Sequence, residues 1–231
     1  MQAVGIVVEY NPFHNGHLHH VTEAKKTTHS EVAIAVMSGQ FLQRGEPALV
    51  DKWHRTKMAL ASGVDIVIEL PYIFSTAQAS LFASGAVQLL EAMKCTHLAF
   101  GSEQGTITPF LNTYEVIEKN RDEYNAIIKE HVQQGKSYPQ ALFIAYEQLT
   151  QLYKNTYIDL AQPNNILGFH YVEAIKAHKC KMQPATIQRI AAGYHDAIDA
   201  ASSIASATGI RQALFGGQNL QQVTQFLPKS S

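Results

Sequence analysis

Apolar and polar positions alternate along the first hundred residues with two different periods. Short runs rich in Val, Ile and Ala have the length and composition of buried strands, at residues 3–8, 32–37, 65–70 and 97–101. Longer stretches with helical patterns lie between and after these runs, at residues 16–28, 50–62 and 75–93. This alternation predicts a parallel sheet covered by helices on both faces. Ligands of such sheets bind at the carboxyl ends of the strands, where the strand order reverses.

The pattern becomes mainly helical after Thr108. Residues 110–152 are polar on one side and are interrupted at Ser137-Tyr138-Pro139, and another helix is expected from Pro163. The last expected elements are a strand, a closing helix and an unpacked polar tail, at residues 186–190, 201–215 and 218–231.

These elements predict a doubly wound, Rossmann-like α/β fold with a helical appendage. The chain then divides into four parts. They are the first part of a nucleotide-binding α/β domain, a helical insertion, the second part of that domain, and a tail that begins a further C-terminal region. Their expected bounds are 1–108, 109–162, 163–217 and 218–231.

Composition and charge narrow the class of protein. The 231 residues are 46% hydrophobic, and 18 Lys and Arg against 19 Asp and Glu give a net charge of −1. A polyanionic partner would therefore have to bind at a local basic patch. Cys95 and Cys180 show no paired spacing, and neither a signal peptide nor an apolar run of membrane length is present. We expect a soluble cytoplasmic protein with no membrane partner, and the sequence leaves its oligomeric state open.

The segment His14-Asn15-Gly16-His17 joins the first expected strand to the first expected helix. Two histidines at a helix start, with a glycine between them, can face a ligand that approaches the backbone. Surface histidines, a zinc site shared with His19 and His20, and general-base catalysis are three alternatives. The spacing matches no common zinc-ligand set, however, and no nucleophilic Ser or Cys accompanies the pair. A helix N-terminus offers unpaired N–H groups and partial positive charge, so phosphate binding is the leading interpretation.

A second group of candidate residues lies late in the chain. Ser202, Ser203, Ser206 and Thr208 precede Arg211, and hydroxyls with a guanidinium at a helix start suit a polyphosphate. A Ser-capped helix with one solvated arginine is the alternative. Considered together with the two histidines, this group favours phosphate binding.

Four other positions have both a structural and a functional interpretation, of similar weight for Asn165 and Arg189 and in favour of the structural one for Lys52 and Arg55. Asn165 either caps a helix or binds a ligand, and Arg189 is either an edge-strand charge or a ligand contact. Lys52 and Arg55, beside Trp53, form either a contact for nucleic-acid phosphates or the polar face of a helix.

The two motifs together resemble the HxGH-type nucleotidylyltransferase superfamily, through His14-Asn-Gly-His17 and Ser206-Ala-Thr-Gly-Ile-Arg211. More narrowly, residues 1 to 216 resemble the bacterial tRNA(Met) cytidine acetate ligases. Several ordered motifs carry this narrower resemblance: Val8-Glu-Tyr-Asn-Pro-Phe-His-Asn-Gly-His17, Met37-Ser-Gly-Gln-Phe, Arg44-Gly-Glu-Pro-Ala, Asp51-Lys-Trp, Ile68-Glu-Leu-Pro71, Phe100-Gly-Ser-Glu103, Pro163-Asn-Asn-Ile-Leu-Gly168 and Ile190-Ala-Ala-Gly-Tyr-His-Asp196.

The resemblance implies ATP-dependent acetylation of N4 of the wobble cytidine in elongator tRNA(Met). Acetate would be the acyl source, acetyl-adenylate the intermediate and ATP the cofactor. Mg²⁺ is expected with the ATP, although no carboxylate cluster indicates a metal site in the protein. The implied ATP-binding residues are Val7, Val8, Glu9, Asn11, His14, Asn15, Gly16, His17, His20, Gly101, Asn165, Arg189, Ile190 and Ser206.

We expect His14, His17 and Arg211 to be the catalytic residues. Acetate is a weak nucleophile, so positioning and charge stabilisation must supply most of the acceleration at the α-phosphorus. The sequence does not indicate which residue is the base for acetyl transfer to the cytidine. A plain adenylyltransferase acting on a small phosphate or nucleotide, and a non-catalytic nucleotide- or RNA-binding module, are the alternatives.

The resembled family continues well beyond the closing helix. Part of the tRNA-binding surface is therefore expected outside residues 1–231, in agreement with the absence of net positive charge.

Overall fold

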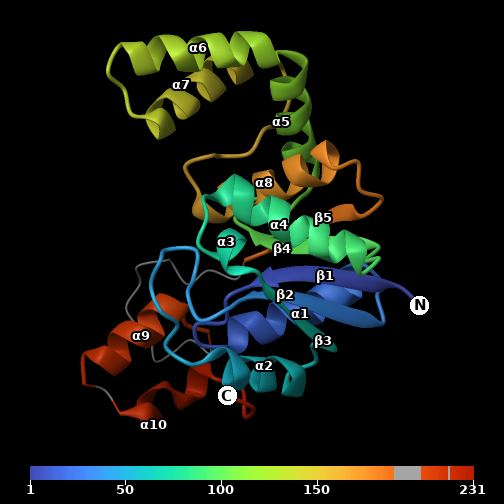
Figure 1. The fold of residues 1–231 in the computed structure, drawn as a ribbon, viewed down its shortest axis with the longest axis vertical. Helices are drawn as coiled ribbons and strands as arrows, with labels where there is room; N and C mark the ends of the chain where they lie inside the picture. The colour runs from blue at the N-terminus through green and yellow to red at the C-terminus, as the bar shows by residue number, and fades with distance from the viewer. Residues whose placement is uncertain (190–203, 218) are drawn as a thin grey trace.

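Five parallel strands form the central sheet of the molecule (Figure 1). The computed structural model describes residues 1–189, 204–217 and 219–231. The strand order is β3-β2-β1-β4-β5, and each neighbouring pair is parallel. The strands are β1 (Ala3–Val8), β2 (Val32–Ser38), β3 (Ile66–Leu70), β4 (His97–Ser102) and β5 (Gln183–Gln188). The predicted doubly wound α/β fold is therefore confirmed.

Helices alternate with the strands and then dominate the second half of the chain. α1 and α2 lie close to their expected ranges, and each begins at a side-chain cap, His14 for α1 and Asp51 for α2. The helices are α1 (Asn15–Thr27), α2 (Lys52–Ala61), α3 (Tyr72–Ser75), α4 (Ala79–Ala92), α5 (Thr108–Lys119), α6 (Arg121–Gln133), α7 (Tyr138–Gln151), α8 (Pro163–Ala177), α9 (Ala207–Phe215) and α10 (Leu220–Val223), with a 3₁₀ turn at Thr224–Phe226.

Three predicted elements are corrected by the structure. The helix expected at residues 75–93 is two helices, because Gln78 has an extended backbone between α3 and α4. The last strand begins at Gln183, before the expected position, because β5 is an edge strand and tolerates Pro184. The closing helix α9 begins only after Ser206, which is also extended. Residues 190 and 201–203 of these predictions lie outside the described residues.

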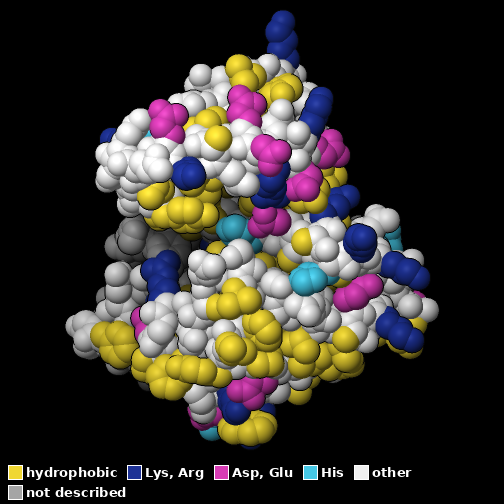
Figure 2. All heavy atoms as spheres, turned by 45° about the horizontal axis from the view of Figure 1, so that its top comes forward, with side chains coloured by type: hydrophobic (Ala, Val, Ile, Leu, Met, Phe, Trp, Pro, Cys, Tyr) yellow, Lys and Arg dark blue, Asp and Glu magenta, His cyan; other side chains and the backbone are white. Residues whose placement is uncertain are grey.

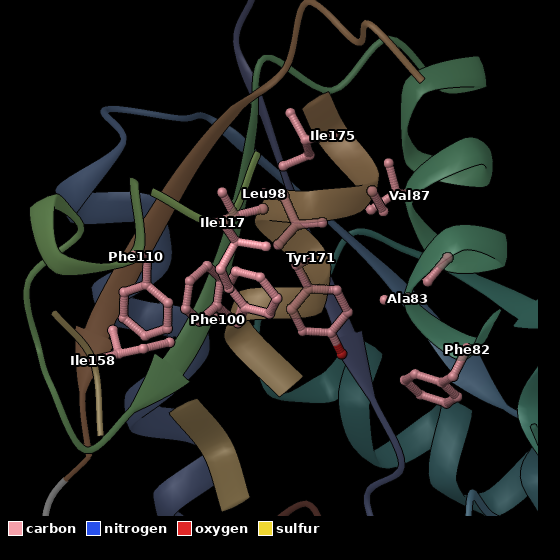
Figure 3. Close-up of a cluster of buried hydrophobic side chains, with 14 of the residues drawn as sticks. Phe82, Ala83, Val87, Leu98, Phe100, Phe110, Ile117, Ile158, Tyr171 and Ile175 are labelled. Carbon is pink, nitrogen blue, oxygen red and sulfur yellow. The ribbon is translucent and has the colours of Figure 1, made fainter. Parts of the chain in front are cut away.

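The two faces of the sheet bury separate apolar cores. α1 and α2 cover one face, where every second residue of β1 is buried: Val4, Ile6 and Val8. α4 and α8 cover the other face, with Phe82, Leu98, Phe100 and Tyr171 in one continuous cluster (Figure 3). Because both faces are buried, the strand sequences are continuous apolar runs and do not alternate between apolar and polar residues.

The helices between β4 and β5 extend this second core away from the sheet. α6 and α7 lie at the top of the molecule, above α5 and α8 (Figure 1). The expected interruption before α7 is confirmed, because Ser137 caps the helix and Pro139 stands in its first turn. Tyr146 of α7 donates from its hydroxyl to the carbonyl of Ile158, which ties this helix to the segment before α8.

The C-terminal segment packs against the rest of the chain, so the expected unpacked tail is wrong. Val223 and Phe226 are fully buried in a small apolar cluster with Ile210 of α9. Asn15 Nδ2 donates to the carbonyl of Gln225 at 2.9 Å, which connects the tail to the start of α1. Within the described ranges, the helices are all too short or too polar to cross a membrane.

Candidate functional site

The strand order reverses between β1 and β4, and the His14–His17 segment lies at this point. From β1, the chain adds β2 and then β3 on one side of this strand, and afterwards β4 and β5 on its other side. The loop after β1 therefore opens into the crevice where doubly wound sheets bind their ligands. His14 is the N-cap of α1, with an extended backbone, and His17 is the third residue of the helix.

Backbone hydrogen bonds fix which nitrogen of each histidine carries the proton. Gly16 N–H donates to His14 Nδ1 at 3.1 Å, and His14 N–H donates to His17 Nδ1 at 3.3 Å. A backbone N–H is always a donor, so both Nδ1 atoms act as acceptors and each neutral ring carries its proton on Nε2. The two rings lie side by side with their centroids 3.7 Å apart. The pair thus presents two Nε2–H donors from adjacent positions.

Burial keeps this group of histidines neutral. Burial, together with the positive charge of Arg189, lowers the pKa of His14 to about 4 and that of His20 to about 4. The pKa of His17 is held well below its ordinary value by burial and by the neighbouring His14 and His20. All three rings are therefore uncharged at neutral pH, and the Nε2–H groups of His14 and His17 can bond an incoming phosphate oxygen without first losing a counter-ion.

The structure gives no support to a zinc site at these histidines. The described part of the chain contains no group of three or more His, Cys, Asp or Glu side chains arranged to hold a metal ion. In addition, both Nδ1 atoms of the pair are already occupied by backbone N–H groups.

Gly16 is required for the histidine pair itself. A Cβ at this position would lie 2.8 Å from His14 Cε1, closer than side chains tolerate. The sequence suggested close approach of a ligand as the reason for this glycine, whereas the structure shows that it first makes room for the His14 ring.

His20, Gly101 and Arg189 come together on the β4–β5 side of the crevice. A Cβ at Gly101 would lie 3.4 Å from Arg189 Cγ and 3.9 Å from His20 Cδ2. His20 Nε2 is buried and has no hydrogen-bond partner among the described residues. A buried polar atom without a partner costs free energy, and a ligand that enters this space would satisfy it. Ile190, expected beside them, lies outside the described residues.

Asn165 holds the loop after β4 with both ends of its amide. Its Oδ1 accepts from Gln104 N–H at 3.2 Å and its Nδ2 donates to the carbonyl of Asp159 at 3.0 Å. Glu103 accepts from Asn164 Nδ2 and from Asn165 N–H, at the N-terminus of α8. The two motifs Phe100–Glu103 and Pro163–Gly168 therefore form one structural unit, and direct contact between Asn165 and a nucleotide stays a prediction.

Glu9 and Asn11 lie on the opposite, β2 side of the first loop. Glu9 Oε1 accepts from Gln43 N–H at 2.8 Å, and Asn11 Oδ1 accepts from Leu49 N–H at 2.6 Å. Burial raises the pKa of the Glu9 carboxyl, and the nearby charge of Glu46 raises it further. Val7 and Val8 are the last two residues of β1. A ligand in the crevice would therefore contact them at the end of the strand and not in a loop.

Arg211 links α9 to the first loop. Its Nη1 donates to the carbonyl of Asn11 at 2.7 Å, and its Nη2 lies 3.7 Å from Glu46. Ser206 is the N-cap of α9, and its Oγ accepts from Gly209 N–H at 3.0 Å. The serine hydroxyl is thus used within the helix, while the guanidinium of Arg211 lies beside the predicted phosphate site. Ser202 and Ser203 lie outside the described residues.

Sequence reasoning missed the role of Arg55. This side chain is fully buried and donates to the carbonyls of Val50, Glu9, Ser38 and Gly39. A buried arginine cannot contact nucleic-acid phosphates, so that alternative is wrong for Arg55. The sequence could not indicate this role, because the four carbonyls come from the loop after β1, the end of β2 and the segment between β2 and α2. It fixes the ends of β1 and β2 relative to each other.

A parallel sheet with a histidine-capped helix after its first strand defines a nucleotidyltransferase-type α/β protein. The chain belongs to the HIGH nucleotidyl transferase family, whose family model matches residues 1–231.

Within this family, the chain is similar to enzymes of one particular kind. The chain is 63% identical over 231 residues to the tRNA(Met) cytidine acetate ligase of Lysinibacillus sphaericus (strain C3-41), covering 100% of this chain and 57% of that protein. It is 52% identical over 233 residues to the tRNA(Met) cytidine acetate ligase of Bacillus subtilis (strain 168), covering 100% of this chain and 55% of that protein.

A solved structure shares the whole fold. The crystal structure of Thermotoga maritima TmcAL bound with alpha-thio ATP superimposes with a TM-score of 0.85 at 36% identity, covering 100% of this chain and 54% of that chain. The chain therefore spans a little over half the length of the relatives that it matches.

Proposed function

We propose that this protein is part of an ATP-dependent tRNA(Met) cytidine acetate ligase and that its site activates acetate as acetyl-adenylate. The neutral histidine pair at the start of α1 is the observation that carries the proposal. The similarity to named cytidine acetate ligases and to an enzyme bound to an ATP analogue supports ATP and acetate as its substrates. The acetyl acceptor would be the wobble cytidine of elongator tRNA(Met).

The geometry suits in-line attack on the α-phosphorus. The acetate carboxylate forms a new P–O bond while the bond to pyrophosphate breaks. His14 and His17 would donate from Nε2 to phosphate oxygens, and these hydrogen bonds strengthen as negative charge accumulates in the transition state. Arg211, which already reaches the first loop, would add positive charge on the same side. None of the three has to change its protonation state during this step.

The adenosine would occupy the β4–β5 side of the crevice. The lack of a side chain at Gly101 would let the adenosine approach the backbone beside Arg189, and the unpartnered Nε2 of His20 would supply a polar contact. Mg²⁺ is expected to accompany ATP and would neutralise part of the phosphate charge.

The RNA half of the reaction needs a surface that binds the polyanionic tRNA. On the face shown in Figure 2, Lys and Arg side chains are interspersed with Asp and Glu. The net charge of −1 agrees with this mixture. We propose that the protein binds this tRNA in the cytoplasm and that the anticodon base is unstacked before it reacts.

Mass spectrometry of the products tests the proposal. The protein is incubated with isotope-labelled acetate, ATP and elongator tRNA(Met), and the nucleotides and digested tRNA are analysed. We expect labelled acetyl-AMP, and labelled N4-acetylcytidine if the RNA surface is sufficient. A dinucleotide product made without acetate would instead identify a plain adenylyltransferase. ATP that is bound but unchanged with every acyl donor would indicate a nucleotide- or RNA-binding module.

A further inference from the structure

Three aromatic side chains are exposed where the chain leaves β2 and β3 at their carboxyl ends. Phe41 lies in the loop after β2, Trp53 in the first turn of α2 and Tyr72 at the start of α3. Trp53 is 68% exposed and Tyr72 is 67% exposed, and Phe41 is exposed as well. Exposed apolar side chains that lie together often mark a binding surface. We call these three residues the aromatic edge.

The structure fixes two of these rings relative to each other. The rings of Phe41 and Tyr72 meet in a T-shaped contact, with their centroids 5.9 Å apart. The buried Ser75 donates from Oγ to the carbonyl of Phe41 at 2.8 Å, which joins α3 to the loop after β2. Because the rings are held before a partner arrives, less conformational entropy is lost when one binds.

Trp53 is connected to this pair through Lys52. The Nζ atom of Lys52 lies 5.3 Å from the centre of the Trp53 ring and 2.7 Å from the carboxylate of Glu69, close to the end of β3 that leads into α3. The backbone N–H of Lys52 donates to Gln40 Oε1 at 3.2 Å, in the loop that carries Phe41. The three rings therefore lie along one edge of the sheet.

The aromatic edge is continuous with the crevice at the histidine pair. Gln43 N–H, two residues after Phe41, donates to Glu9 at 2.8 Å. Leu49 N–H, near the end of the same loop, donates to Asn11 at 2.6 Å. Glu9 and Asn11 belong to the segment that joins β1 to the histidine-capped helix α1. A group bound on the aromatic edge can therefore extend into the crevice from the β2–β3 side, opposite the proposed adenosine space.

The charges beside the aromatic edge suit a polyanion. α2 contributes Lys52 and Lys57, and its ten residues include no Asp or Glu. Two carboxylates next to these lysines are engaged, because Asp51 accepts from two backbone N–H groups of α2 and Glu69 pairs with Lys52. Flat rings beside cations bind the unstacked bases of single-stranded RNA together with their phosphates.

We propose that the aromatic edge stacks unstacked bases of the anticodon loop and thereby presents the wobble cytidine to the crevice. This inference rests on the proposed function, in which that cytidine must leave its stack before it reacts. Every base has a flat face, so the rings would hold the loop without reading its sequence.

Trp53 provides a direct readout, because it is the single tryptophan of the chain. The protein is titrated with an RNA hairpin that has the anticodon stem and loop of elongator tRNA(Met), and the tryptophan emission is followed. We expect a saturable quenching of this emission as a base stacks on the ring. A fully paired RNA duplex of the same length should leave the emission nearly unchanged, because its bases are already stacked.

Tyr72→Leu separates base stacking from general apolar contact. Leucine keeps an apolar surface but has no ring, so the hairpin should bind about 5- to 150-fold more weakly, as expected when one base loses its stacking partner. Tyr72→Phe keeps the ring and should bind as the wild type does. Tyr138→Leu is the matched control, because this ring is 61% exposed and lies on α7, away from α2 and α3 (Figure 1). All three variants should melt like the wild type, since the substituted rings are mostly exposed.

Equal affinity of the wild type and Tyr72→Leu for the hairpin would overturn the proposal, and so would an emission that does not respond to the hairpin. An emission that changes only with the protein concentration would identify an interface between protein chains and would overturn it as well. The proposed function is tested separately, by acetate-dependent exchange of pyrophosphate into ATP without RNA. Absence of this exchange in the wild type would refute the proposed function, whereas the quenching experiment decides the role of the aromatic edge.

Discussion

At the scale of single residues, two backbone N–H groups decide what the histidines can do. Each donates to an Nδ1 atom, so the donors that remain are the Nε2–H groups. The same hydrogen bonds cap α1, which joins helix stability and phosphate binding in one pair of side chains. Substitutions can separate these roles, because other side chains cap a helix equally well.

His14→Asn should separate capping from phosphate binding. Asparagine is a good N-cap, so the free energy of unfolding should change by less than about 1 kcal/mol. Pyrophosphate exchange should fall by about 10²- to 10³-fold, because the Nε2–H donor is lost. His14→Ala loses the cap as well and should also melt at a lower temperature. Unchanged exchange in His14→Asn, measured beside a thermal melt, would exclude a catalytic role for this ring.

Gly16→Ala tests whether the position of the His14 ring matters. The new Cβ would lie 2.8 Å from His14 Cε1 and must displace the ring. Alanine favours a helix by about 1 kcal/mol over glycine, so the helix itself should not be weakened. The displaced ring is also the N-cap of α1, so the lost cap should offset this gain. We expect exchange to fall while the melting temperature stays close to that of the wild type, as measured by the exchange assay and by calorimetry. A variant that exchanges pyrophosphate at the wild-type rate would show that the ring position is not critical.

At the scale of elements, the site depends on loops that are held by side chains far away in the sequence. Arg55 of α2 fixes the ends of β1 and β2, Asn165 fixes the loop after β4, and Arg211 of α9 reaches the first loop. The strands and most helices could be predicted from apolar periodicity, because that signal is local. These three links could not be predicted, because each joins residues that come close only after folding.

Removal of the Arg55 side chain should disturb both loops. Arg55→Met leaves the buried carbonyls of Glu9, Ser38 and Gly39 without their donor. Hydrogen bonds to a charged group contribute about 1.5–3 kcal/mol each, so the free energy of unfolding in urea should fall by at least this much. Lys57→Met, on the same helix and exposed, is the control. Equal stability of the two variants would contradict the role assigned to Arg55.

At the scale of the whole molecule, the sequence predicted the sheet, the crevice and the histidine pair, but not the packing around them. The tail was expected to be unpacked because its composition is polar. Two buried side chains, Val223 and Phe226, are nevertheless sufficient to dock it beside α9. The four-part division of the chain stays a prediction, although the helices between β4 and β5 share one apolar core with the sheet.

The buried histidines should make stability depend on pH. Their pKa values are lowered in the folded state, to about 4 for His14 and for His20, so the unfolded chain binds more protons below its ordinary histidine pKa. The free energy of unfolding should therefore fall as the pH drops from about 6.5 towards 4, by at most about 1.4 kcal/mol per pH unit for each histidine. Urea titrations across this range measure the slope, and His14→Asn should reduce it. An equal slope in both proteins would contradict the neutral-histidine account.

The central claim is that the histidine-capped crevice activates acetate with ATP, and isotope exchange tests it most directly. Labelled pyrophosphate is incubated with the protein, ATP and Mg²⁺, with and without acetate. The account predicts that label enters ATP only when acetate is present, and that His14→Asn nearly abolishes this exchange. Exchange that does not require acetate, or no exchange by the folded wild-type protein, would contradict the claim.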